Sequence, residues 1–483
     1  MAAVLRQLMW GPAAVYESEE EVRWKMEDFR FCVHESIPSW ALQQQHGGPC
    51  GVFAPVQAMM LARLGANALV PLAPYDRDLL LAEVLADMLV AATESANDVV
   101  WLVDAAEVSA SPSSPFRPIQ VARSDLASEV LSFLVHGRRG VLSFVYSVMY
   151  TRGLERLRDD MDDAESSLTG GQFGHGTQEL LNLMLTGRAT SNVFDGTVPM
   201  GDTGLVLRGV DARPPVGYLT HLEALRYCTV GSFYKSPVAP VWVLGSTSHF
   251  TVLFATDAAL CEESSSDALL AKVQRAFKQF DSMESGFMPI DSLGACLAQL
   301  EVDTAILNNQ FQMGRLFSKI EVPGAGIVLW EDFWRVVSIL LETNDLQQAL
   351  DGKVKETSTT RKRSDSDVAR ELQAQFDAET SGTAMPATAI PAPAAERMTL
   401  DDEADRIRPV VLYHYNGLVK NEGLPRLVTF HAKIHSKNQV GYSVPMVDTS
   451  HSGGHGCPIE DVMKTMWPRM EVDWQGQAPP RLD

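Results

Sequence analysis

Two hydrophobic patterns alternate through the N-terminal part of the chain. Apolar residues recur at helical spacing directly after Cys50 and again through residues 75–92, so both stretches are predicted to be helices. Short β-rich runs at residues 99–103 and 241–244 are predicted to be strands. Because helices and short strands alternate irregularly between residues 29 and 260, we expect a mixed α+β (or α/β) fold.

The pattern changes after this region. Apolar residues recur at helical spacing through residues 269–341, which predicts a small helical unit. Residues 351–408 are rich in Ser, Thr, Ala and Pro, a composition that cannot bury enough apolar surface to offset its ordering entropy, so a disordered linker is predicted. Globular composition then returns, with strand-like runs at residues 410–413, 427–431 and 441–444 and a helical run at 459–467.

Four parts are therefore predicted along the chain. A polar, glycine-rich stretch inside the first part, residues 158–176, is expected to be a mobile surface loop. The last part is expected to pack back on the first. The parts are an α+β region at residues 9–265, a helical unit at 266–345, the linker at 351–408 and a C-terminal segment at 409–478.

Length and charge narrow the classes of function. With 483 residues the chain is long enough for roughly two to four packed units. Forty basic against sixty-one acidic residues give a net charge of -21, which repels phosphate backbones and anionic lipid, so nucleic acid is not expected as a partner. No apolar run approaches the ~20 residues of a membrane span, and the first residues lack the pattern of a signal peptide. We expect a protein of the cytoplasm or nucleus, without membrane association.

The cysteines indicate a reducing environment. They lie singly, without a Cys-x-x-Cys pair, which is typical neither of a disulfide framework nor of a zinc site built from paired cysteines. We expect free thiols, no metal and no cofactor. The six are Cys32, Cys50, Cys228, Cys261, Cys296 and Cys457.

The sequence around Cys50 is typical of a reactive thiol at a helix start. The turn Gly47-Gly48-Pro49 leads directly into Cys50, and apolar residues follow at helical spacing. A helix N-terminus offers unpaired N–H groups and the positive end of the helix dipole, which stabilise a thiolate. Gln44, six residues upstream, adds a side-chain donor for a tetrahedral oxyanion. An isolated cysteine after a turn is also commonly a small buried hydrophobe, so this segment alone leaves both interpretations open.

His249 has the setting of a catalytic base. Residues 241–254 are predicted to form a strand, a short polar turn and a second strand that begins at His249, with Phe250, Val252 and Phe254 on its core face. A cysteine on a helix and a histidine on a distant strand are the arrangement of papain-like cysteine peptidases. A histidine that is merely hydrogen-bonded at a strand end is the alternative.

Five short motifs follow one another along the chain. They are Gln44 with Gly47-Gly48-Pro49-Cys50 and Ala54-Pro55-Val56-Gln57-Ala58; Leu181-Asn182-Leu183-Met184-Leu185-Thr186-Gly187-Arg188-Ala189 with Asn192-Val193-Phe194-Asp195-Gly196; Ser248-His249-Phe250-Thr251; Tyr413-His414-Tyr415-Asn416-Gly417-Leu418; and Trp467-Pro468. Together they resemble the MINDY family of cysteine deubiquitinases, in the branch with an EF-hand-like insertion. The resemblance covers most of residues 9–476, except for the linker.

The resemblance implies a function and a set of site residues. Cys50 would be the nucleophile, His249 the general base and Gln44 the oxyanion donor of a thiol-dependent ubiquitin carboxyl-terminal hydrolase with a papain-like core. Its partners would be polyubiquitin and ubiquitinated proteins, with a preference for the chain linkage that marks proteins for the proteasome. The substrate follows from the resemblance only.

Two further residues have more than one interpretation. Thr251 shares a strand face with His249, so it could orient the imidazole or contact the substrate, although an ordinary half-buried strand threonine is at least as common. Arg188 could meet an acidic or carbonyl group of the substrate, although an exposed arginine is more often a solvated surface residue.

Two other functions remain open on the sequence alone. One is a catalytically silent ubiquitin-binding scaffold, which has no chemical reason to retain Cys50, His249 and Gln44 together. The other is a papain-like thiol hydrolase that acts on a different amide. Labelling by a ubiquitin with a C-terminal electrophile distinguishes both from a deubiquitinase.

The helical unit contains two degenerate calcium loops. Residues 281–292 begin with Asp and have Gly286 at the sixth position, but Met283 stands at the third position and Ser292 replaces the bidentate glutamate at the twelfth. A second candidate at residues 321–332 is weaker still. We predict an EF-hand-like helix pair that binds no calcium.

Overall fold

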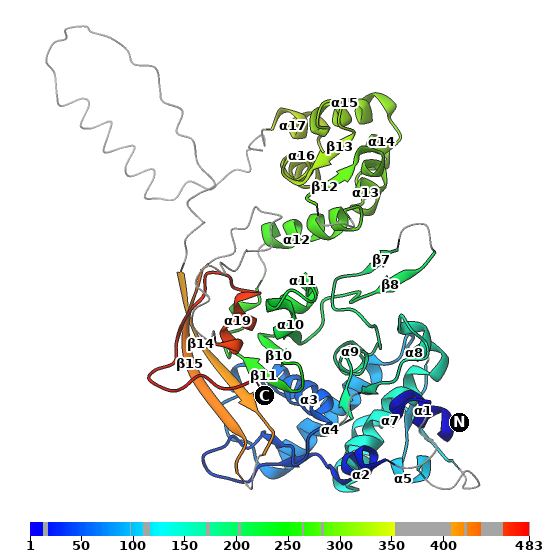
Figure 1. Ribbon diagram of the computed structural model, residues 1–483, viewed down its shortest axis with the longest axis vertical. Coiled ribbons are helices and arrows are strands. Elements are labelled where there is room, and N and C mark those ends of the chain that lie inside the picture. Colours follow the sequence, from blue (N-terminus) through cyan, green and yellow to red (C-terminus); the bar gives the residue numbers. More distant parts are fainter. Residues whose placement is uncertain are drawn as a thin grey trace, which may run out of the picture. The chain divides into compact units, whose positions relative to one another are not determined.

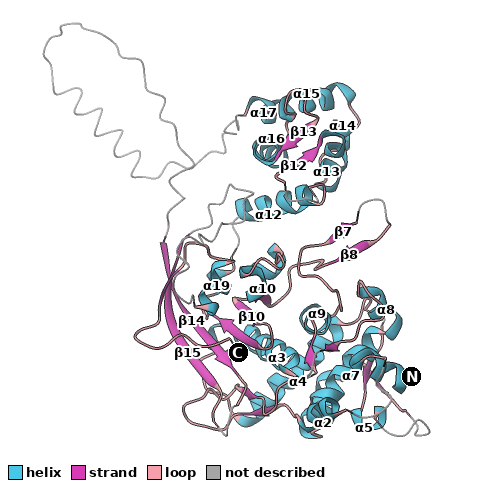
Figure 2. Cartoon of the chain, viewed as in Figure 1, coloured by secondary structure: helices cyan, strands magenta, loops and turns pink. Residues whose placement is uncertain are grey.

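The computed structural model contains two compact units. It describes residues 1–12, 18–96, 98–109, 116–170, 174–200, 204–262, 265–281, 285–352, 407–419, 423–435 and 457–482. The larger unit comprises Met1–Met283 with Arg406–Asp483, and the smaller one is Glu284–Asp405. Figure 2 shows helices and strands in both. The larger unit holds every residue of the candidate site.

The larger unit is mixed α+β. Its helices are α1 Ala2–Trp10, α2 Glu19–Met26, α3 Cys50–Leu64, α4 Pro74–Ala91, α5 Ala105–Val108, α6 Leu126–Val130, α7 Gly140–Arg152, α8 Leu154–Asp160, α9 Gln178–Thr186, α10 His221–Ala224, α11 Ser232–Lys235, α12 Ser265–Lys278 and α19 Pro458–Lys464. Its strands are β1 Arg30–Phe31, β2 Leu42–Gln43, β3 Val100–Leu102, β4 Ile119–Val121, β5 Thr169–Gly170, β6 His175–Gly176, β7 Thr197–Pro199, β8 Val206–Arg208, β9 Gly217–Thr220, β10 Val241–Gly245, β11 Phe250–Phe254, β14 Ile407–Asn416, β15 Arg426–His435 and β16 Glu471–Asp473. The predicted helices at Cys50 and residues 75–92 are therefore confirmed as α3 and α4.

The larger unit contains a six-stranded sheet, whose long strands β14 and β15 lie on the left in Figure 1. Its order is β16-β15-β14-β11-β10-β9, with β9 parallel to β10 and the other neighbours antiparallel. The strands β10 and β11 form a hairpin, and β11 then pairs with β14 so that Val252 lies opposite Tyr415. A strand from the C-terminal segment is thus the direct neighbour of the strand that follows His249.

Helices cover both faces of the sheet centre. The helix α3 packs on β10 and β11 from one side, and every residue of β10 is buried. On the other side, the rings of Trp242 and Trp467 meet edge to face with their centroids 5.4 Å apart, next to the buried α19 residues Ile459 and Val462. Burial on both faces explains why the β10 sequence is a continuous apolar run instead of an alternating one.

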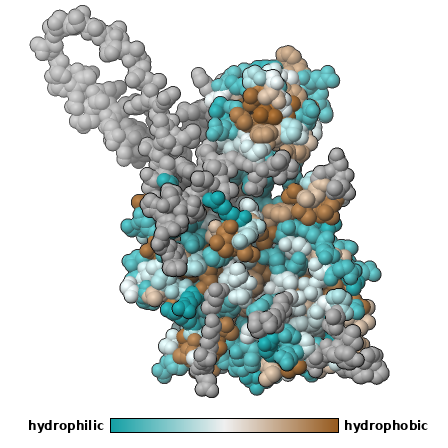
Figure 3. Space-filling model, viewed as in Figure 1, coloured by the Kyte–Doolittle hydropathy of each residue, from teal (hydrophilic) through white to brown (hydrophobic). Residues whose placement is uncertain are grey.

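One hairpin lies outside these layers. The strands β7 and β8 pair from Thr197 to Arg208, and Figure 3 shows apolar side chains gathered over this hairpin, where Met200, Leu205 and Val206 are 45%, 49% and 37% exposed. The hairpin contributes none of its described residues to the two buried clusters of the unit.

The smaller unit is helical with one short antiparallel pair of strands. Met288 pairs with Val328, and each is the eighth residue of one of the two candidate calcium loops, which supports the EF-hand-like interpretation. Met283 lies outside the described residues. The elements are β12 Phe287–Pro289, α13 Leu293–Gln299, α14 Thr304–Leu307, α15 Gln310–Ile320, β13 Ile327–Leu329, α16 Trp330–Thr343 and α17 Leu346–Asp351.

One sequence prediction was wrong, and others concern residues that the structure does not describe. The expected surface loop at residues 158–176 contains the end of α8 and the β5–β6 pair, and Asp160 within it is only 6% exposed. Asp160 accepts two hydrogen bonds from Arg152, at 2.8 and 2.7 Å, and this ion pair allows the carboxylate to be buried. The linker, apart from its ends, and the predicted strand at 441–444 lie outside the described residues. The bounds of the four predicted parts stay predictions.

Candidate active site

Cys50 is the first residue of α3 and is only 2% exposed. The turn before it needs a glycine at position 48, because the backbone there has φ +121° and a Cβ would come within 2.8 Å of the Trp24 indole nitrogen. The sulfur of Cys50 lies 3.9 Å from the Gly48 carbonyl oxygen, to which the thiol donates. The turn therefore delivers the cysteine to the helix start with its hydrogen directed at the backbone.

Burial dominates the ionisation of this thiol. It raises the pKa of Cys50 to about 11, against the opposing effect of the backbone N–H groups of Phe250, Gly51 and Cys50 itself, which donate towards the sulfur. The expected stabilisation by the helix start is present, but it is the weaker of the two effects. Cys50 is thus a neutral thiol at physiological pH in this structure and needs a base to become a nucleophile.

His249 lies at the end of the β10–β11 turn, immediately before β11, and is 6% exposed. Its backbone is fixed by Ser246, whose N–H donates to the His249 carbonyl at 2.9 Å and whose Oγ accepts from the His249 N–H at 3.0 Å. The next residue, Phe250, directs its N–H at the Cys50 sulfur. The two predicted catalytic residues are therefore brought together, one on the helix and one on the neighbouring strand.

Asn416, at the end of β14, orients the imidazole. Its Oδ1 lies 3.0 Å from His249 Nε2 and also accepts the N–H of Leu418 at 2.9 Å. Because the Leu418 N–H can only donate, the atom it meets is the amide oxygen, and the ring nitrogen facing that oxygen must carry hydrogen. In the neutral ring the acceptor nitrogen is then Nδ1.

Gln44 is 2% exposed and lies in a short bridge to the C-terminal segment. Its N–H donates to the Gly417 carbonyl at 2.8 Å, and its carbonyl accepts from Val419 at 2.9 Å. The side-chain Nε2 donates to the His46 carbonyl at 2.5 Å. The predicted oxyanion donor thus belongs to the same cluster, with its amide held by the loop that leads to Cys50.

Thr251 contacts a different histidine from the one expected. Its Oγ1 lies 2.9 Å from His414 Nε2, and both residues are 1% exposed. Burial lowers the pKa of His414 to about 3, with further lowering by His249 and Arg426, so this second imidazole is neutral. The position that the sequence suggested for Thr251, next to the His249 ring, is taken by Asn416.

Comparison with known proteins identifies the family. A model of the conserved domain of the deubiquitinating enzymes MINDY-3/4 matches residues 6–271. Mouse ubiquitin carboxyl-terminal hydrolase MINDY-3 is 33% identical over 370 residues, covering 68% of this chain and 80% of the mouse protein. The chain belongs to the MINDY-3/4 family. Human MINDY-3 is 28% identical over 521 residues and matches 99% of this chain and 98% of its own length. Mouse probable MINDY-4 is 35% identical over 284 residues, which is 53% of this chain and 37% of that protein. No solved structure matches.

The MINDY motif that begins in α9 and continues into the following loop has an architectural role. Asn182 is fully buried; its amide nitrogen donates to the carbonyls of Thr190 and Asn192 at 2.7 and 2.9 Å, and its oxygen accepts from Tyr234 at 2.7 Å. Arg188 is engaged in ion pairs with Asp211 and Glu94. These contacts hold the loop after α9 and account for the motif without a substrate.

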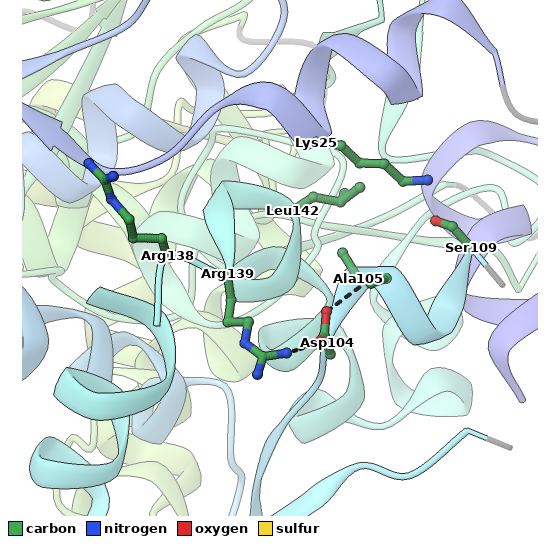
Figure 4. Close-up of a pocket in the computed structure, with 8 residues that line it drawn as sticks. Lys25, Asp104, Ala105, Ser109, Arg138, Arg139 and Leu142 are labelled. Carbon is green, nitrogen blue, oxygen red and sulfur yellow. Dashed lines mark hydrogen bonds and ion pairs between the residues drawn. The ribbon is translucent and has the colours of Figure 1, made fainter. Parts of the chain in front are cut away.

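A surface recess elsewhere in this MINDY-3/4 chain is separate from the site. Figure 4 shows it between α2, α5 and α7, with Lys25, Arg138 and Arg139 among its lining residues. Arg139 pairs with Asp104 there, and none of the predicted catalytic residues lines the recess.

Neither a metal centre nor a membrane span is found in the described part of the chain. Within those ranges, no three His, Cys, Asp or Glu side chains come close enough together to hold a metal ion. Among the helices described, none is both long and apolar enough to cross a bilayer.

Proposed function

We propose that this chain is a cysteine-type deubiquitinase that hydrolyses the isopeptide bonds of ubiquitin chains. The observation that carries the proposal is the hydrogen bond between His249 and Asn416, which orients an imidazole beside a cysteine at a helix start. A helix cysteine, a strand histidine and an amide that orients the histidine together form the arrangement of papain-like cysteine peptidases. Membership of the MINDY-3/4 family, with relatives named ubiquitin carboxyl-terminal hydrolases, supplies the substrate.

The chemistry begins with proton transfer from Cys50 to His249. Because Nε2 is held by Asn416, Nδ1 accepts the thiol proton, and the sulfur forms a bond to the carbonyl carbon at the C-terminus of ubiquitin. The negative charge that develops on the carbonyl oxygen is stabilised by the Gln44 amide and by N–H groups at the start of α3. His249 then protonates the lysine amine as the carbon–nitrogen bond breaks. A water molecule, deprotonated by His249, hydrolyses the thioester and restores the thiol.

Two features of the resting site agree with this sequence of steps. The neutral Cys50 thiol requires the base that His249 provides. Gln44 has two side-chain N–H donors: one donates to the His46 carbonyl and holds the amide in place, and the other donates to the oxyanion when substrate is bound. A preference for the linkage that marks proteins for the proteasome follows from the family resemblance and belongs to this proposal.

A ubiquitin with a C-terminal electrophile tests the proposal. Intact mass of the wild-type protein is expected to increase by one ubiquitin, whereas Cys50→Ala shows no increase and His249→Ala reacts at least about a hundredfold more slowly, since the thiol loses its base. The Cys228→Ala variant, which removes a partly exposed thiol elsewhere in the chain, should react like the wild type. Labelling that persists in Cys50→Ala would contradict the assignment.

One observation favours a second function, a catalytically silent ubiquitin-binding scaffold. The Cys50 thiol is almost fully buried and its pKa is raised to about 11, as is typical of a structural cysteine. Binding of polyubiquitin with neither labelling nor cleavage by the wild type would support the scaffold and exclude the enzyme.

A further inference from the structure

A buried carboxylate lies beneath the loop that leads to Cys50. Glu27, directly after α2, is 2% exposed. Its Oε1 accepts the backbone N–H of Gln45 at 3.1 Å, the backbone N–H of His46 at 2.6 Å and the ring Nδ1–H of His46 at 2.8 Å. Three donors from two consecutive loop residues therefore converge on one oxygen atom, and charge makes such bonds stronger than neutral ones.

These bonds continue to the proposed oxyanion donor. The carbonyl of His46 accepts the side-chain N–H of Gln44 at 2.5 Å. The carboxylate of Glu27 accepts the backbone N–H and the ring N–H of His46, and the carbonyl of His46 accepts the side-chain N–H of Gln44. The place of the Gln44 side chain thus depends on the place of Glu27.

Glu27 is itself fixed by the scaffold. Its N–H donates to the Trp24 carbonyl at 3.2 Å, and its carbonyl accepts the N–H of Val141 in α7 at 3.0 Å. A side chain at Gly140 would come within 2.9 Å of the Glu27 carbonyl oxygen, so the two segments approach closely. Lys25, two residues before Glu27, and Leu142, which follows Val141, line the surface recess of Figure 4. The backbone of Glu27 is therefore anchored to α2 and α7, while its carboxylate binds the loop before Cys50.

We propose that Glu27 is a positioning residue of the hydrolase, which sets the oxyanion donor Gln44 in place through His46. The proposal rests on the proposed function. A catalytic donor has to be placed within a fraction of an ångström of the developing charge, and its displacement by about 1 Å costs about a hundredfold in rate. A buried ionised carboxylate is costly unless its hydrogen bonds are satisfied, and three loop donors satisfy it here.

The experiment measures kcat and KM for cleavage of a fluorogenic amide attached to the C-terminus of ubiquitin. The proteins compared are the wild type, Glu27→Ala, Gln44→Ala and the double variant. Glu27→Ala is expected to lower kcat at least about tenfold with KM changed less than about twofold, because only the oxyanion contact is disturbed. Since Glu27 acts through Gln44, the double variant should be no slower than Gln44→Ala alone. Multiplicative effects of the two substitutions would overturn the proposal.

A second readout separates positioning from a general loss of structure. Alkylation of Cys50 by iodoacetamide develops no oxyanion, so its rate should be unchanged in Glu27→Ala, whereas displacement of the cysteine would change both reactions. Glu27→Gln keeps one oxygen acceptor, but its neutral amide binds the three loop donors more weakly than a carboxylate, so it should lower kcat less than Glu27→Ala and still by at least about threefold. It replaces Glu27→Ala in the cycle if that variant does not fold. A fall in both alkylation and kcat in Glu27→Gln would overturn the proposal.

Glu21 provides the matched control. It lies in α2, is 1% exposed and binds Arg6 and Ser109. Glu21→Gln also replaces a buried carboxylate in this segment, and we expect it to leave kcat unchanged. An equal loss of kcat in the folded Glu21→Gln and Glu27→Gln variants would overturn the specific role of Glu27. A wild type that neither cleaves the amide nor reacts with the electrophile would contradict the proposed function itself, an outcome distinct from those above.

Discussion

At the scale of single residues, the site is built from groups whose ordinary properties are changed by burial. Cys50 begins a helix, as a nucleophile should, yet removal from water outweighs the N–H groups that surround its sulfur. His249 is oriented by an amide that fixes which ring nitrogen carries hydrogen. The proposed reaction therefore begins with transfer of a proton within the site and not with a preformed thiolate.

The raised pKa of Cys50 makes a prediction about the free protein. Because the thiolate fraction grows about tenfold per pH unit below the pKa, alkylation of Cys50 by iodoacetamide should be slow at pH 7 and rise about tenfold per unit up to pH 10. The rate is measured from the mass of the Cys50 peptide, with Cys50→Ser as the blank. Fast, pH-independent alkylation from pH 6 upwards would show a thiolate–imidazolium pair and contradict the prediction.

Local sequence was sufficient for some of the site residues and not for others. Cys50 and His249 each lie in a short segment whose turn and periodicity predict the element that carries them, and the structure brings both together. Asn416 was missed because its role depends on β14 pairing with β11, a contact between residues far apart in the sequence. Its only sequence signal was its place inside the family motif at residues 413–418. Glu27 carries no motif, and nothing near it in sequence indicates that its carboxylate meets Gln45 and His46.

At the scale of elements, helices with clear periodicity were predictable and pairings were not. The helices α3 and α4 follow from apolar spacing and the turn residues before them. The order of the sheet does not follow from local sequence, because about 150 residues separate β11 from β14 along the chain. The pairing of these strands is stabilised by packing and not by local propensity. Acidic composition likewise could not show that Asp160 is buried with Arg152.

The end of α9 illustrates how tightly these elements pack. Gly187 ends the helix with φ +78°, and a Cβ there would collide with the carbonyl of Ala91 at the end of α4. Gly187→Ala is therefore expected to lower the free energy of unfolding by about 2–4 kcal/mol, the sum of backbone strain and overpacking. Gly352→Ala is the control: Gly352 ends α17 in the same left-handed region, with φ +66°, but nothing lies near its Cβ, so only about 1 kcal/mol is expected. Urea unfolding of both variants measures the difference, and equal losses would contradict the clash.

At the scale of the whole molecule, the C-terminal segment completes the catalytic unit. Asn416 contacts His249, Gly417 and Val419 hold the backbone of Gln44, and the Tyr415 hydroxyl donates to the Leu42 carbonyl at 2.6 Å. The segment thus holds the two ends of the candidate site, the proposed base directly before β11 and the proposed oxyanion donor before α3. The inserted unit at Glu284–Asp405 separates these residues along the chain but not in the fold of the larger unit.

Substitution of Asn416 tests the contribution of this segment. Asn416→Ala removes the acceptor for the His249 ring and is expected to lower kcat about tenfold to a hundredfold, because the imidazole loses its preferred tautomer and orientation. Asn416→Asp keeps an acceptor oxygen and should retain more activity than the alanine variant. Unchanged kcat for cleavage of a ubiquitin fluorogenic amide by a folded Asn416→Ala protein would contradict the role.

The late position of Asn416 in the chain has a consequence for biosynthesis. While the ribosome is still making the inserted unit, Cys50, Gln44 and His249 have all been synthesised, but β14 has not. The nascent polypeptide therefore carries the proposed nucleophile and base without the strand that orients the imidazole, and we expect it to act on ubiquitin at least as slowly as Asn416→Ala does. Full activity is expected only once the last strands of the sheet have been translated and paired.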